Sequence, residues 1–204
     1  VDNFAADLSY HHRKIFLDPM NVEENGGKGF LHCFVELAPA GSNADAKWAV
    51  AGKLADVDLS VMNGLLKISE DMGGKCSGNL RVANEGHGFV WSADIADSAP
   101  RWQKYSLSAL SGDIHGTKSE IDLKNLRFSY FKGEHSLSGK VTIPDKGGVK
   151  NAALDLVLNS DRINLYEVLR KHLNGVRGVQ GLAKLNLRIT GAAMSPRFSG
   201  TAAL

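Results

Sequence analysis

Apolar and polar residues alternate with a period of two over most of the chain after Gly29. Val57, Leu59 and Val61 alternate with polar residues, and the same pattern returns around Ile121 and Leu154. Successive side chains of a β-strand point to opposite faces, so this period predicts strands with one apolar and one polar face. Glycine-containing turn segments separate the runs. The sequence therefore predicts an all-β chain, a long antiparallel meander of hairpins with one face in water.

One segment departs from this period. Ile163, Tyr166, Leu169 and Leu173 recur at helical spacing after the possible cap residues 159–161. This spacing predicts a short amphipathic helix near residues 162–174. Such a helix either plugs the end of the sheet or contacts a partner or a membrane through its basic side.

The two ends of the chain differ in how well the pattern defines them. In residues 1–47 we expect one strand around Arg13 to Leu17 followed by loop, and the pattern does not define a fold. Residues 48–204 form the strand-rich segment. The chain begins at Val1 rather than Met and stops at Leu204 within a strand-like run, so we expect it to be a piece of a longer protein whose membrane anchor lies elsewhere.

A serine–glycine step recurs at an equal interval. Gly78, Gly139 and Gly200 lie 61 residues apart, and the residues around each of them are alike. Equal spacing with similar sequence indicates a repeated supersecondary unit. Glycine inside a strand often marks a bend or the close approach of a neighbouring strand. We therefore predict repeats of about 61 residues that each bend the sheet at the same place.

Composition and charge exclude some classes of protein. The chain has 204 residues, a hydrophobic fraction of 43% and a net charge of +2, with both signs scattered along its length. Without a basic cluster, we expect no nucleic-acid partner. No stretch reaches the roughly 20 apolar residues that cross a bilayer. Cys33 and Cys76 fit no metal or redox spacing and are either two buried thiols or one disulfide.

Candidate catalytic and metal-binding residues have simpler explanations. Adjacent histidines His11 and His12 point to opposite faces of a strand and cannot easily share one ion. Asp56, Asp58 and Asp94 occupy the polar half of the alternation, which suits a wet face better than a catalytic carboxylate pair. The glycine runs are too short for phosphate loops. We therefore expect no enzyme activity, no metal and no cofactor.

The last third of the chain resembles a known family. A stretch from Asn159 to Leu169 is followed by Gly181-Leu-Ala-Lys-Leu-Asn-Leu187-Arg-Ile-Thr-Gly191 and then by Pro196-Arg-Phe-Ser-Gly200. This order resembles the repeat of the TamB/AsmA-like family of envelope proteins, in which a short helix precedes Gly-x-Leu-x-Leu-x-Leu-x-Gly and Pro-x-Leu-x-Gly-x-Leu. The resemblance covers roughly Trp48 to Leu204. Gly191-Ala192 replaces the family's usual Gly-Thr, and residues 1–29 do not match.

The resemblance implies a half-pipe, or β-taco: a long curved antiparallel sheet with an apolar concave face. It implies a periplasmic segment of an inner-membrane-anchored protein that conducts phospholipids between the inner and outer membranes. The alternative is a scaffold that assists outer-membrane protein assembly together with an Omp85-class barrel. The pattern alone also allows a closed sandwich or barrel core. For the groove, we predict this lining: Val57, Leu59, Leu66, Ile68, Leu80, Val82, Phe89, Trp91, Ile121, Leu123, Phe128, Leu137, Val141, Ile143, Leu154, Leu156, Leu158, Leu185, Leu187, Ile189 and Phe198.

Overall fold

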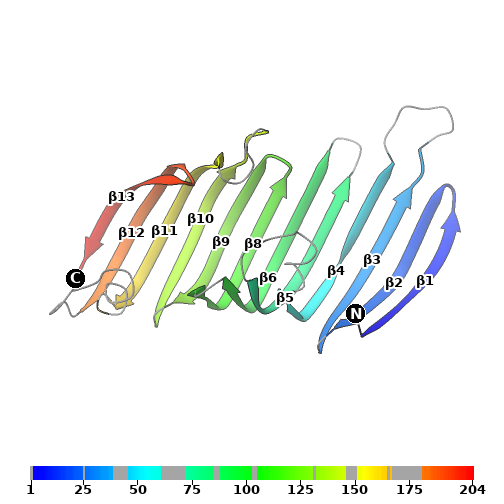
Figure 1. Cartoon of the computed structure of the whole chain (residues 1–204), viewed down its shortest axis with the longest axis horizontal. Coiled ribbons are helices and arrows are strands. Elements are labelled where there is room, and N and C mark those ends of the chain that lie inside the picture. The colour runs from blue at the N-terminus through cyan, green and yellow to red at the C-terminus, as the bar shows by residue number, and fades with distance from the viewer. Residues whose placement is uncertain are drawn as a thin grey trace.

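The structure is a computed structural model of the whole chain. It describes residues 2–24, 26–38, 46–60, 72–84, 88–102, 105–130, 132–145, 151–164, 166 and 181–204. Figure 1 shows these residues as a row of strands that lie side by side from one end of the molecule to the other. The strands are β1 (Asn3–His11), β2 (Lys14–Glu24), β3 (Gly27–Glu36), β4 (Lys47–Asp58), β5 (Met72–Asn84), β6 (Phe89–Trp102), β7 (Tyr105–Ser106), β8 (Ser108–Thr117), β9 (Glu120–Tyr130), β10 (Gly133–Thr142), β11 (Ala153–Asn164), β12 (Leu182–Ala192) and β13 (Ser195–Ala203).

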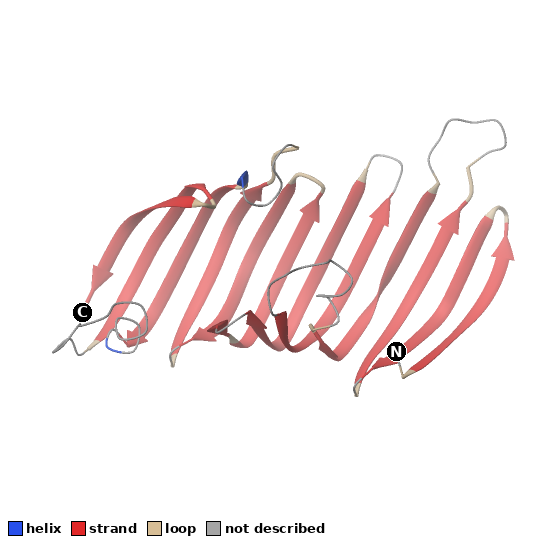
Figure 2. Cartoon of the chain, viewed as in Figure 1, coloured by secondary structure: helices blue, strands red, loops and turns tan. Residues whose placement is uncertain are grey.

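All thirteen strands belong to one antiparallel sheet. Their spatial order follows the chain order, except that the two-residue strand β7 pairs only with the end of β6. Figure 2 shows that the described part is almost entirely strand. The predicted all-β antiparallel architecture is therefore confirmed. The sheet is open and uncurled, and the half-pipe shape implied by the resemblance stays a prediction.

The N-terminal part is more ordered than the sequence indicates. Instead of one strand around Arg13 to Leu17, residues 3–36 form β1, β2 and β3, and β3 pairs with β4 from Lys28 to Glu36. Residues before and after position 47 therefore share one sheet. Pro19 obscures the pattern because it sits where the pairing of β2 shifts register, between Leu17 and Met20. Proline, which has no N–H to donate, is tolerated at such an irregularity.

The predicted start of the helix near 162–174 is wrong. Residues 159–164, including the expected cap residues and Ile163, belong to β11, and all but Asp161 and Arg162 pair directly with β12. Of the remaining helix residues, the structure describes only Tyr166, which has helical backbone. Pairing with β12 outweighs the local helical spacing of residues 159–164, so they adopt strand conformation.

The three glycines of the serine–glycine steps each allow a close approach of two strands. Gly78, Gly139 and Gly200 have φ angles of 148°, 127° and 151°. A Cβ added to them would lie 2.0, 2.2 and 1.9 Å from a carbonyl oxygen of the neighbouring strand. Only glycine avoids both the strained φ and this contact. The 61-residue interval itself spans four strand steps from Gly78 to Gly139 but three from Gly139 to Gly200, so it does not correspond to a fixed number of strands.

The sheet buries little of its surface. The accessible area is 13460 Å², whereas a compact protein of this mass exposes about 9,300 Å². Few apolar side chains are buried, and many of these are alanines such as Ala49 and Ala83. Described strands form a single layer, so most apolar side chains keep part of their surface accessible.

Gly116 gives a direct test of packing on the sheet. It pairs with Trp91, and a Cβ at position 116 would lie 2.2 Å from the indole ring. We expect Gly116→Ala to displace that ring and to lower the free energy of unfolding by about 1–3 kcal/mol in urea titrations. Gly29→Ala is the matched control, because its added Cβ would lie 3.4 Å from the nearest atom. In a Trp91→Leu background the loss at position 116 should shrink; an unchanged loss would contradict the Trp91 contact.

Candidate functional site: the apolar face of the sheet

Strand register places the apolar positions of the chain on one face. In an antiparallel sheet, directly paired residues of neighbouring strands have side chains on the same face. One such row crosses every long strand from β1 to β13: Leu8, Leu17, Cys33, Val50, Val82, Trp91, Gly116, Ile121, Val141, Leu154, Gly191 and Pro196. No charged side chain interrupts this row.

A second row lies two residues along each strand, or three in β2 where the register shifts between Leu17 and Met20, and it is equally apolar. It contains Ala6, Met20, Leu31, Gly52, Leu80, Ala93, Ile114, Leu123, Gly139, Leu156, Ile189 and Phe198. The two rows together form a continuous apolar surface, which we call the apolar face. Exposure varies along it: Leu156 is 8% exposed, whereas Phe198 at the last strand is 64% exposed.

The opposite face, here called the polar face, carries the charges. A row through its middle contains Arg81, Ser92, His115, Asp122, Lys140, Asp155, Thr190 and Arg197. Arg188 donates two hydrogen bonds to Asp155, at 3.0 and 3.1 Å, and Lys140 donates one to Glu120 at 2.8 Å. These bonds raise the pKa of both basic groups. The pairs are too exposed to add much stability, and they keep this face hydrated.

The polar face has one apolar area near the N-terminal half. Phe16, Phe34, Ala49, Ala83 and Val90 are successive partners across β2 to β6. The rings of Phe16 and Phe34 lie 6.4 Å apart between centroids. This area is confined to one end of five strands, whereas the apolar face extends over the whole sheet.

Most of the predicted lining residues lie on the apolar face. Leu59 and Ile143 lie just beyond the ends of β4 and β10, where their backbone N–H groups donate to Gly74 and Ser119. Leu66 and Ile68 lie outside the described residues. All the other predicted lining residues occupy the apolar face by register.

Sequence reasoning missed the N-terminal third of this face. Leu17, Leu31 and Cys33 belong to its two rows, whereas the predicted lining begins at Val57. Alternation of Leu31, Cys33 and Val35 with His32 and Phe34 was the available signal. It was weak because Phe34 is apolar and lies on the opposite face.

Tryptophans and cysteines also face this surface. Trp48 lies 6.4 Å from Phe89 between ring centroids, and Trp91 covers Gly116. Trp102 is in β6, but its side chain lies outside what the structure describes. Cys33 and Cys76 are free thiols. Burial raises the pKa of the Cys33 thiol above its ordinary value of 9.0, because the thiolate is poorly solvated there.

The carboxylates and histidines of the described residues do not gather into a metal-binding cluster. The described residues contain no group of three or more His, Cys, Asp or Glu side chains that could hold a metal ion. The Asp58 carboxylate accepts a hydrogen bond of 2.8 Å from the Ser60 N–H, and this bond lowers its pKa. Asp94 accepts one from Asn79. No helix among the described residues is long and apolar enough to cross a membrane.

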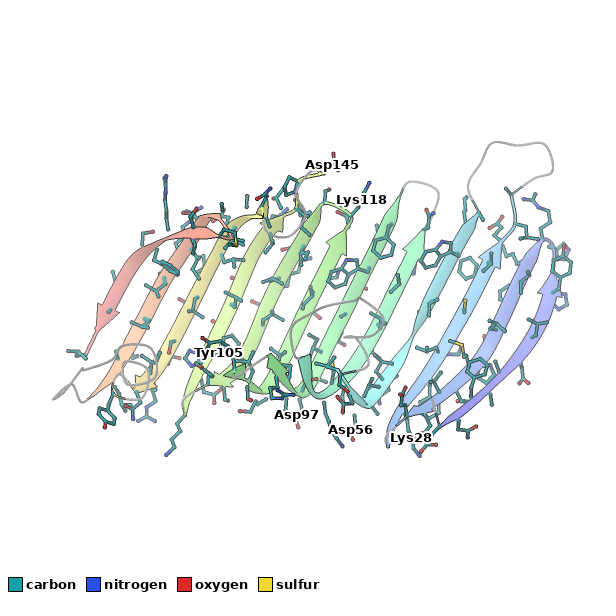
Figure 3. All side chains as sticks on the ribbon, in the orientation of Figure 1. Lys28, Asp56, Asp97, Tyr105, Lys118 and Asp145 are labelled. Atoms are coloured by element: carbon teal, nitrogen blue, oxygen red, sulfur yellow. The ribbon has the colours of Figure 1, made fainter. Side chains whose placement is uncertain are left out.

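A hollow of about 400 Å³ lies on the apolar face where β7 approaches strands β9 to β12. Its lining residues are Tyr105, Leu107, Phe128, Tyr130, His135, Leu158, Ser160, Ile163 and Leu185. Figure 3 shows Tyr105 beside the lower ends of β9 and β10. Its volume is in the range of small-molecule sites, and its lining is almost entirely apolar.

Comparison of the chain with family models, with curated proteins and with solved structures gave no significant match.

Proposed function

We propose that the apolar face carries phospholipid acyl chains, as a segment of a hydrophobic path between two membranes. The observation that supports this most is the apolar surface that spans the sheet from β1 to β13 and that, among the described residues, only the segment at β7 approaches. Large exposed apolar surfaces on proteins usually mark binding sites for apolar partners. An extended track fits a long flexible chain better than a compact ligand.

The energetics suit transport rather than tight storage. Each CH₂ removed from water contributes about 0.8 kcal/mol, so an acyl chain gains several kcal/mol from the apolar face alone. This gain is non-directional and nearly equal at each successive row. A chain can therefore move from one row to the next without a large barrier, and no catalytic group is needed.

The setting follows from the TamB/AsmA-like resemblance. In that setting the chain is a periplasmic segment of an inner-membrane-anchored envelope protein, and its cargo moves between the inner and outer membranes. Part of the resemblance rests on the alternation of Leu185, Leu187 and Ile189 with polar residues. These three side chains of β12 lie on the apolar face.

Co-purified lipid is the first expected result. The chain, purified without strong detergent and examined by native mass spectrometry, should retain phospholipid, which extraction and tandem mass spectrometry would identify. A chain that carries no phospholipid, and that extracts none from phosphatidylethanolamine–phosphatidylglycerol vesicles, would contradict the proposal.

Cys33 reports where that lipid binds. It lies in the first apolar row, and its raised pKa should make alkylation by iodoacetamide at pH 8 slower than in an unfolded peptide. Addition of the same vesicles should slow it further. The control is Lys53→Cys on the polar face, in a chain whose two native cysteines are alanine. Equal protection of both positions would indicate nonspecific adsorption.

A second function, assembly of other envelope proteins, has one observation in its favour. Strands β1 and β13 each pair with a single neighbour, so their outer edges can accept a strand from a partner such as an Omp85-class barrel. Photo-crosslinkers placed on the apolar face separate the two functions. Lipid adducts support transport, and protein adducts support assembly.

A further inference from the structure

Two serines of the sheet are equally buried but differ in their hydrogen bonding. Ser98 and Ser160 are both 2% exposed. The Ser98 hydroxyl accepts a hydrogen bond from the Ser77 N–H at 2.9 Å and can donate its proton to the carbonyl oxygen of Ser77 or of Ala96, each 3.2 Å away. The Ser160 hydroxyl has no hydrogen-bond partner among the described residues. A buried polar group without a partner is costly, so its presence needs an explanation.

Ser160 lies in the wall of the hollow under β7, next to a second polar residue. It pairs with His135 across β10 and β11 and with Leu185 across β11 and β12. His135 is 6% exposed, and its ring stacks on Phe128 with centroids 5.2 Å apart. The hollow thus combines an apolar wall with a small polar spot.

The ring N–H of His135 is already used in a hydrogen bond within the protein, whereas, among the described residues, the Ser160 hydroxyl is not. The distance from His135 Nε2 to the Tyr130 carbonyl oxygen is 2.9 Å. A carbonyl oxygen only accepts, so Nε2 carries the proton and donates it there. In the neutral ring the other nitrogen, Nδ1, is an acceptor. Of the paired residues His135 and Ser160, Ser160 is then the one whose side chain can donate a hydrogen bond to something bound in the hollow.

An apolar ligand with one uncharged acceptor oxygen matches this wall. An ionised carboxylate would lose its hydration in the apolar hollow at a large cost. A water molecule needs two to four polar partners, and the apolar wall provides few. An ester carbonyl needs a single donor, and it sits where the acyl chains of a phospholipid meet its head group.

The position of the hollow suits the boundary between the acyl chains and the head group of a phospholipid. Phe128, Tyr130 and His135 flank the β9–β10 turn, where Tyr130 pairs with Gly133, at the ends of these two strands. Leu158 and Leu185 continue from the hollow onto the apolar face. An ester held at Ser160 can therefore direct its chain along the apolar face while its head group leaves past the end of the strands.

We propose that the hollow between β7 and strands β9 to β12 is a phospholipid acyl-ester site, in which the ester carbonyl accepts a hydrogen bond from the Ser160 hydroxyl. This inference rests on the proposed function and adds a specific binding site to the apolar face. Ser160 then lowers the stability of the empty protein in exchange for binding, as residues of binding sites often do.

The test measures the binding of two lipids to two forms of the protein. Short-chain phosphatidylcholine that stays monomeric in water, and its dialkyl ether analogue without carbonyl groups, are titrated calorimetrically into the native chain and into Ser160→Ala. We expect the native chain to bind the ester about 5- to 10-fold more tightly than the ether. Ser160→Ala should bind both lipids equally, with the affinity of the native chain for the ether.

A stability measurement without lipid checks the premise. Removing an unpaired buried hydroxyl should raise the Tm of Ser160→Ala by about 2–4 °C. Ser98→Ala, the matched control, should lower it because its hydroxyl is hydrogen-bonded. A lower Tm for Ser160→Ala would show that the hydroxyl already has a partner and would overturn the proposal.

The outcomes separate this site from the proposed function. Equal binding of ester and ether by the native chain would overturn the Ser160 site but leave the apolar track intact. An ester preference that persists in Ser160→Ala would place the carbonyl elsewhere and would also overturn it. Binding of neither lipid would overturn both the site and the proposed function.

Discussion

Gly139→Ala should destabilise the protein by about 3 kcal/mol or more, one of the largest losses expected from a single added methyl group. Gly139 has a φ angle of 127°, which is strained for a residue with a side chain. The added Cβ would also lie 2.2 Å from the Asp155 carbonyl oxygen. Because that obstacle is backbone, β10 and β11 would have to separate locally. Urea unfolding followed by circular dichroism measures the loss.

Ser138→Ala is the control for this substitution. It changes the other member of the serine–glycine step, whose half-buried side chain points to the polar face, and should alter stability by less than about 0.5 kcal/mol. Gly78→Ala and Gly200→Ala should behave like Gly139→Ala, since their added Cβ atoms would lie equally near a carbonyl oxygen. A Gly139→Ala chain as stable as the Ser138→Ala chain would show that the strands separate at little cost.

The alternation of apolar and polar residues was enough to predict the fold class and most of the apolar face. Leu154, Leu156 and Leu158 alternate with Asp155, Val157 and Asn159, and the register places all three leucines on one face. A one-residue slip would move every side chain of a strand to the opposite face, so a clear alternation fixes register strongly. The same argument made Leu185, Leu187 and Ile189 predictable.

Elements with mixed signals were not predictable. Phe30 and Phe34 are apolar but lie on the polar face of β3, which blurs the alternation there. Residues 159–164 carry helical spacing, yet they extend β11 because β12 provides partners for their backbone groups. In both cases pairing with a distant part of the chain outweighs the local pattern.

The hollow at Ser160 could not be predicted at all. Its wall combines side chains from β9, β10, β11 and β12 with residues at β7. In the sequence Ser160 looks like a helix cap, and His135 looks like one polar residue among others. Only the register, which pairs these two residues across neighbouring strands, shows that they share an apolar wall.

The transport proposal predicts that Leu187→Asp will reduce phospholipid transfer between donor and acceptor vesicles at least about tenfold. Leu187 is half-buried on the apolar face between Leu158 and Gly200. A carboxylate there must either lose its water to a passing acyl chain or exclude the chain, and each costs several kcal/mol. Leu156 is a poorer test site, because it is 8% exposed and a charge there threatens folding. Transfer of a fluorescent phospholipid between vesicles gives the rate.

Asn186→Asp adds the same charge at the neighbouring residue of β12 but on the polar face. Asn186 donates a hydrogen bond of 2.6 Å to its partner Asn159, and an aspartate can accept one from the same amide. This variant should transfer lipid at the native rate, and both variants should show native circular dichroism. If Leu187→Asp folds and transfers lipid as fast as Asn186→Asp, acyl chains do not travel along the apolar face. If both variants slow transfer equally, the added charge acts on vesicle contact, and the track is again not the route.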